Sequence, residues 1–100
     1  KSGKIDVMNI FTTDGQLSGS KLTVLEDDKH FFPSYYCATV VREETLKEHP
    51  ELETVLWKMN NILTDSEMAD LNYQVDIAGR PEREVAADFL KRKGLLKNEQ

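Results

Sequence analysis

The hydrophobic pattern of this 100-residue chain changes its period at Glu43. Before this residue the apolar positions come in short runs, which are typical of buried β-strands. These runs predict strands over residues 5–11, 22–25 and 37–41. After it, apolar residues recur every three or four positions, as they do along the buried face of an α-helix. The sequence therefore predicts either an α+β domain or one part of a doubly wound α/β lobe.

The second pattern predicts four helices, of which the first two meet at a proline. The first covers residues 43–48 and stops before Pro50, because the residue that precedes a proline avoids the helical conformation. Pro50 then suits the first turn of a longer helix, whose apolar face extends to Leu63. Residues 16–20, by contrast, are polar and rich in glycine and serine, so we expect them to form a loop or a crossing segment.

The last two predicted helices have recognisable starts. Thr64 and Glu67 have the spacing of a capping box, and Pro81 suits the first turn of the fourth helix. The residues expected to face inward are Met68, Leu71, Val75, Val85, Ala86, Phe89 and Leu90. Asn72 and Tyr73 lie in the third helix, where hydrogen bonding to a neighbouring loop would explain buried polar groups.

Charge and composition argue against several classes of function. The formal net charge of -5 disfavours non-specific binding of nucleic acids. No apolar run approaches the roughly 20 residues that a membrane-spanning helix needs. Cys37 is the only cysteine, so no disulfide can form within the chain.

The residues that commonly carry chemistry are dispersed along the sequence. His30 and His49 lack metal-ligand spacing with each other or with the cysteine, and we expect neither a metal nor a cofactor. No nucleophile, base and orienting group form a recognisable set. The sequence therefore does not predict an enzyme.

The first predicted strand ends in an aromatic residue and two threonines. Phe11 is followed by Thr12 and Thr13, whose donors could hold a ligand carboxylate. Open α/β sheets bind ligands at the carboxyl ends of their strands, and aromatic faces attract quaternary ammonium cations. The structural alternatives are a core position for Phe11 and a turn in which the threonines satisfy their own backbone.

A second aromatic group, which we call the aromatic corner, lies at residues 31–36. It contains Phe31, Phe32, Tyr35 and Tyr36 around a proline. Neighbouring side chains of an extended segment alternate in direction, so at least one of the four rings should meet solvent, a ligand or a partner. A corner packed over the sheet is the structural alternative.

Four segments of the sequence together resemble a known family. They are Asp6-Val-Met-Asn-Ile-Phe-Thr-Thr-Asp-Gly15, Leu25-Glu-Asp-Asp-Lys-His-Phe-Phe-Pro33, Val40-Val-Arg-Glu-Glu-Thr-Leu46 and Leu71-Asn-Tyr-Gln-Val-Asp76. In order and content they are similar to the glycine betaine/carnitine/choline substrate-binding proteins of osmoprotectant ABC transporters. The likeness covers nearly the whole chain.

The resemblance implies an α/β fold of the periplasmic-binding-protein type II class, whose two lobes close on a quaternary ammonium solute. The chain would be a C-terminal fragment with about three short strands followed by about four helices. Residues 1–20 would form a strand of lobe two and the hinge crossing, residues 21–96 would return into lobe one, and residues 97–100 would form a tail.

The resemblance also implies a cage in which rings from both lobes surround the trimethylammonium group. Phe11 matches one ring position, where the family usually has tyrosine, and Tyr35 matches a second. Phenylalanine keeps the cation-attracting face but lacks the hydroxyl group. With Thr12 and Thr13 as nearby donors, these residues form the predicted ligand site.

The implied function is capture of glycine betaine, choline or carnitine outside the cytoplasm and delivery to an ABC permease. The permease is either a separate subunit or a fused domain, and the parent protein is membrane-associated as a lipoprotein or as a permease fusion. Exposed strand edges of the fragment also suggest a homodimer or strand exchange between copies. A different class of function is a protein-interaction module that uses the aromatic corner.

Overall fold

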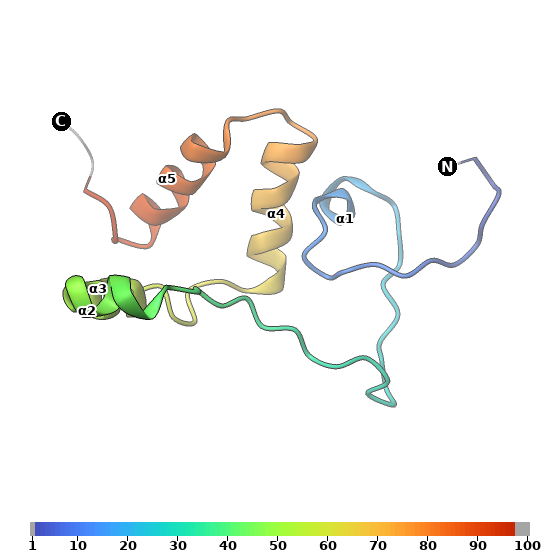
Figure 1. Cartoon of the computed structure of the whole chain (residues 1–100). Coiled ribbons are helices and arrows are strands. Elements are labelled where there is room, and N and C mark those ends of the chain that lie inside the picture. The colour runs from blue at the N-terminus through green and yellow to red at the C-terminus, as the bar shows by residue number, and fades with distance from the viewer. Residues whose placement is uncertain (1, 98–100) are drawn as a thin grey trace. The chain divides into compact units, whose positions relative to one another are not determined.

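The structure is a computed structural model that describes residues 2–97 (Figure 1). Within this range the chain forms α-helices and no β-strand. The helices are α1 (Gly15–Gly19), α2 (Glu43–Glu48), α3 (Glu51–Trp57), α4 (Asp65–Asp76) and α5 (Glu82–Arg92). No helix in the described range combines the length and the apolar character needed to cross a bilayer. The predicted tail lies outside the described residues except for Lys97.

Contacts within the chain divide it into two units. One contains the described residues up to Leu22 and those from Leu63 onward, and it includes α1, α4 and α5. We call it the α4 unit. The other, the α2/α3 unit, covers Thr23–Ile62 and includes α2 and α3.

The predicted start of α4 is confirmed by its hydrogen bonds. The Thr64 hydroxyl oxygen accepts from the Glu67 backbone N–H at 3.1 Å, and the Glu67 carboxylate accepts from the Thr64 backbone N–H at 3.0 Å. These bonds satisfy N–H groups that have no partner inside the helix. The Lys93 ammonium group donates to the same carboxylate at 2.8 Å, so the end of α5 is tied to the first turn of α4.

The hydrogen bond from Lys93, and then that from the Thr64 backbone, lower the pKa of the Glu67 carboxyl group below its ordinary value. The stabilising contribution of the charged Glu67 carboxylate is therefore fully present above the pKa of glutamate in the unfolded chain, and it is lost as the pH falls through the lower folded-state pKa. Glu67→Gln keeps the capping geometry but removes the charge. We expect it to lower the thermal midpoint at pH 7 and to lower it less at pH 3.

Glu84 provides the control for this measurement, because it occupies the third position of α5 as Glu67 does in α4. Glu84→Gln removes a charge at the same helix position, so it reports the part of the effect that comes from the helix terminus, and it should lower the midpoint at pH 7 by less than Glu67→Gln does. A shift for Glu67→Gln that is equal at pH 7 and pH 3 would contradict the assigned role of its charge.

The core of the α4 unit involves α4 and α5. Val85 and Phe89 of α5 are 3% and 4% exposed, and Ala69 of α4 is 5% exposed. The predicted burial of Val85 and Phe89 is thus confirmed, whereas the prediction for Ala86 is wrong, because Ala86 is exposed. Residues four positions apart share one face of a helix, and the neighbouring position points elsewhere. The other predicted core residues are half-buried: Met68, Leu71, Val75 and Leu90.

Of the two alternatives predicted for residues 16–20, the loop is wrong, because most of this segment belongs to the short helix α1. The Asp14 side chain caps α1 by accepting a hydrogen bond from the Gln16 N–H at 2.9 Å. α1 packs against α4 (Figure 1). A Cβ atom at Gly15 would lie 2.6 Å from the backbone carbonyl carbon of Asn72. Glycine permits this close approach, which gives a reason for the glycine other than loop flexibility.

The helix predicted from Pro50 to Leu63 ends early, at Trp57. The next three residues donate to carbonyl groups three positions back, and Asn61 adopts a φ of +57°. Asparagine has low helix propensity and tolerates the left-handed conformation better than most residues. The pair Asn60-Asn61 therefore ends the helix although the apolar spacing continues beyond it.

The three strands predicted over residues 5–11, 22–25 and 37–41 are not formed in the described part of the chain, and this part of the fold prediction is wrong for the structure. A strand needs a neighbouring strand to satisfy its backbone N–H and C=O groups, whereas a helix satisfies them within its own segment. No ladder joins these segments within residues 2–97. The four helices predicted after residue 42 are present.

Candidate functional site

Phe11, Thr12 and Thr13 form a tight turn that leads into α1. The Asp14 backbone N–H closes this turn by donating to the Phe11 carbonyl oxygen at 3.0 Å. The side chain of Asp14 then caps α1, so the turn continues directly into the helix. Phe11 is 71% exposed in this structure.

Two side chains of α4 hold this turn. The Thr12 hydroxyl group donates a hydrogen bond to the Asp65 carboxylate at 2.6 Å. The Asn72 side-chain amide donates to the Thr13 carbonyl oxygen at 2.7 Å, and this second contact is partly buried. The predicted hydrogen bond between Asn72 and a neighbouring loop is therefore confirmed.

Tyr35 lies in the aromatic corner of the α2/α3 unit. The Asp27 carboxylate organises the start of this corner by accepting from the backbone N–H groups of Phe31 at 3.0 Å and Phe32 at 2.9 Å. The rings of these two phenylalanines meet edge to face, with 5.1 Å between their centroids. All four rings of the corner are exposed, Tyr35 by 78%, which confirms that at least one ring faces away from a core.

The structure brings three of the four predicted site residues together. Phe11, Thr12 and Thr13 share one turn in the α4 unit, whereas Tyr35 belongs to the α2/α3 unit. Each of the two predicted ring residues is largely exposed within its own unit.

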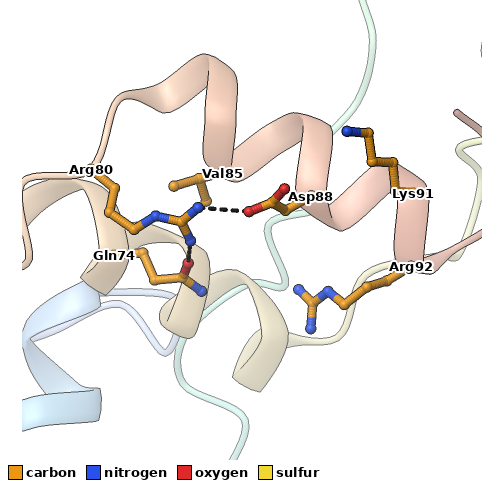
Figure 2. A pocket seen from close by; sticks show the side chains of 6 residues that line it. All are labelled: Gln74, Arg80, Val85, Asp88, Lys91 and Arg92. Carbon is orange, nitrogen blue, oxygen red and sulfur yellow. Dashed lines mark hydrogen bonds and ion pairs between the residues drawn. The ribbon is translucent and has the colours of Figure 1, made fainter. Parts of the chain in front are cut away.

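An open pocket in the α4 unit offers a different kind of lining (Figure 2). Its residues are Gln74, Arg80, Val85, Asp88, Lys91 and Arg92. The Arg80 guanidinium group donates to the Asp88 carboxylate at 2.6 Å and to the side-chain oxygen of Gln74. The hydrogen bond from Arg80 lowers the pKa of the Asp88 carboxyl group below its ordinary value. Three cationic side chains against one carboxylate make this pocket a poor site for a quaternary ammonium cation.

The histidines belong to turns and helix ends. His30 lies in the turn after Asp27 with a φ of +50°, and the His49 Nδ1 atom lies 3.4 Å from the Glu51 carboxylate. Within residues 2–97, no group of three or more His, Cys, Asp or Glu side chains is arranged to hold a metal ion. The candidate site therefore consists of aromatic rings and hydrogen-bonding groups.

The sequence matches a protein-family model over residues 1–92. The family is OpuAC, the substrate binding domain of ABC-type glycine betaine transport systems. The chain belongs to this family. OpuAC membership confirms the family predicted from the sequence motifs, and it places the chain among transport binding proteins rather than enzymes.

Three known proteins are similar in sequence to this chain. The chain is 47% identical over 85 residues to the glycine-betaine-binding protein of Pseudomonas aeruginosa. It is 44% identical over 95 residues to the ergothioneine transport permease/ergothioneine binding protein EgtU of Helicobacter pylori. It is 37% identical over 92 residues to the carnitine transport binding protein OpuCC of Listeria monocytogenes.

The alignments cover most of this chain but only a minor part of each relative. They include 85%, 95% and 92% of this chain, and 27%, 17% and 30% of the three relatives in the same order. The chain thus spans less than a third of the length of these relatives.

Proposed function

We propose that this OpuAC chain is part of the extracytoplasmic solute-binding component of an ABC importer for quaternary ammonium osmoprotectants. The observation that carries the proposal is the family match over residues 1–92. Glycine betaine, carnitine and ergothioneine, which the names of the relatives contain, share a trimethylammonium group and a carboxylate. A site for such solutes needs a surface that attracts the cation and donors that hold the carboxylate.

In this proposal Phe11 and Tyr35 are two walls of an aromatic cage. A quaternary ammonium group has no N–H to donate, so the faces of aromatic rings supply the attraction. Both residues are largely exposed within their own units, which leaves their rings reachable by a solute. Thr12 and Thr13 would bind the carboxylate of a betaine, and the Thr12 hydroxyl group, which donates to Asp65, would exchange that acceptor for the ligand.

The proposed parent protein has two lobes in the α/β type II arrangement. Residues 1–20 with Phe11 would belong to lobe two and the hinge crossing, and residues 21–96 with Tyr35 to lobe one. The contact between α1 and α4 would then lie where the hinge crossing meets lobe one. Closure of the lobes would bring both rings to one cation.

Delivery of the solute would require an ABC permease, either as a separate subunit or as a fused domain. The name of EgtU combines a transport permease with a binding protein, which supports fusion as one possible organisation. A lipoprotein anchor is the other. Both organisations place the binding protein at the membrane.

Choline and its neutral isostere 3,3-dimethylbutan-1-ol test the chemistry of the cage, because a carbon atom replaces the charged nitrogen in the isostere. If each of the two rings contributes a cation–π term of about 1 to 2 kcal/mol, choline should bind about thirtyfold to several hundredfold more tightly than the isostere. Titration calorimetry on the full-length protein measures the affinities for choline and for the isostere. Glycine betaine and carnitine are measured as further solutes. Equal affinity for choline and the isostere would contradict the cage, and no binding of any trimethylammonium compound would overturn the proposed function.

The alternative function is a protein-interaction module. Exposed rings favour this function. Trp57 of α3 is 71% exposed and lines an open pocket together with Glu53 and Thr54. The aromatic corner belongs to the same α2/α3 unit. Apolar surface of this kind can bind another protein. The solute titration separates the two functions, since an interaction module has no reason to distinguish choline from its isostere.

A further inference from the structure

We infer that Asn72 is a positioning residue, which fixes the turn that presents Phe11 to the solute. The inference rests on the proposed function, because it gives the turn a ligand to bind. Asn72 lies on α4 and acts on the turn through the Thr13 carbonyl oxygen, which its side-chain amide reaches at 2.7 Å.

Three hydrogen bonds converge on this turn. The Asp14 N–H donates to the Phe11 carbonyl oxygen within the turn, Thr12 donates to Asp65, and Asn72 donates to Thr13. The Thr12 bond is exposed, whereas the Asn72 bond is partly buried. Loss of a shielded donor leaves the carbonyl group without a comparable partner, so the Asn72 bond is the more costly of the two to remove.

The backbone of α4 approaches the same segment. A Cβ atom at Gly15 would lie 2.6 Å from the backbone carbonyl carbon of Asn72, and one at Gly19 would lie 2.6 Å from Cε2 of the Tyr73 ring. Two consecutive residues of α4 therefore contact both ends of α1, while the Asn72 side chain holds the turn before it. In this inference, the contacts of Asn72 and Tyr73 with the turn and with α1 fix the direction in which the Phe11 side chain leaves the turn.

The first test is solute affinity in the full-length protein. Asn72→Ala should weaken choline binding about tenfold. Gln74→Ala is the matched control, because Gln74 is a half-buried amide on the same helix whose side chain contacts Asp70 and Arg80 instead of the turn. The control should bind choline as the unmodified protein does. Asn72→Asp, which keeps the size but removes the amide donor, should weaken binding as the alanine variant does.

A double-mutant cycle separates positioning from a general structural role. If Asn72 acts by placing the Phe11 ring, Asn72→Ala should change choline affinity less than twofold when Phe11→Ala is already present. A second readout is amide exchange at Asp14, whose N–H closes the turn, and this exchange should become faster in Asn72→Ala but not in Gln74→Ala.

Each outcome decides the inference. Additive effects of Asn72→Ala and Phe11→Ala, or unchanged Asp14 exchange in the Asn72 variants, would overturn the positioning role while leaving the proposed function in place. If the unmodified protein binds no trimethylammonium compound, the proposed function and this role are overturned together.

Discussion

Gly15→Val is expected to lower the free energy of unfolding by about 3 kcal/mol, because α1 approaches the backbone of α4 at this residue. The valine Cβ would lie 2.6 Å from both the carbonyl carbon of Asn72 and the amide nitrogen of Tyr73. These are backbone atoms of a helix, so they cannot move aside as the end of a flexible side chain could. α1 would have to separate from α4, and the turn before it would lose its support.

Chemical denaturation of the full-length protein measures this effect. Gln16→Val is the matched control, because it places the same β-branched residue at the next position of α1, where the side chain is exposed. The control should cost only the small difference in helix propensity, well under 1 kcal/mol. Equal stabilities for Gly15→Val and Gln16→Val would show that α1 does not pack against α4 in this way.

Loss of both cage rings is the second large effect. Phe11→Ala and Tyr35→Ala should each weaken choline binding by up to about thirtyfold, given a cation–π contribution of about 2 kcal/mol at a desolvated site. The double variant should weaken binding by several hundredfold if the two rings contact one cation independently. Titration calorimetry on the full-length protein measures the loss.

Phe31→Ala supplies the control for these variants. Phe31 is as exposed as Tyr35 and belongs to the same aromatic corner, but it matches no predicted cage position. It should leave choline affinity within about twofold of the unmodified value. Circular dichroism should show that all variants keep their helices, and equal losses for Phe31→Ala and Tyr35→Ala would remove the reason for assigning Tyr35 to the cage.

The helices could be predicted from the sequence because their signals are local. The capping box at Thr64 and Glu67 involves residues three positions apart, and α2 ends at a proline boundary that a single residue determines. α1 could not be predicted in this way, because its glycines are explained by contact with α4, a helix more than fifty residues away in the sequence. The strand predictions failed for a related reason, because strand pairing depends on a partner outside the predicted segment.

In the candidate site, too, some contacts could be predicted from the sequence and others could not. A polar residue on the expected inner part of a helix predicted that Asn72 hydrogen-bonds to a neighbouring loop, though the sequence did not identify the loop or the direction of the bond. Asp65 has the ordinary character of an acidic residue at a helix start, so its contact with Thr12 had no sequence signal. Asp27 likewise binds backbone groups four and five residues ahead in a turn whose shape the sequence left open.

In the proposed cage, Phe11 and Tyr35 contact one trimethylammonium group. A crystal structure of the full-length protein with bound glycine betaine tests this contact. The quaternary nitrogen is expected to lie within about 6 Å of the centroids of both rings. A solute bound away from either ring, or a Phe11 ring packed into the protein core, would contradict the proposed cage.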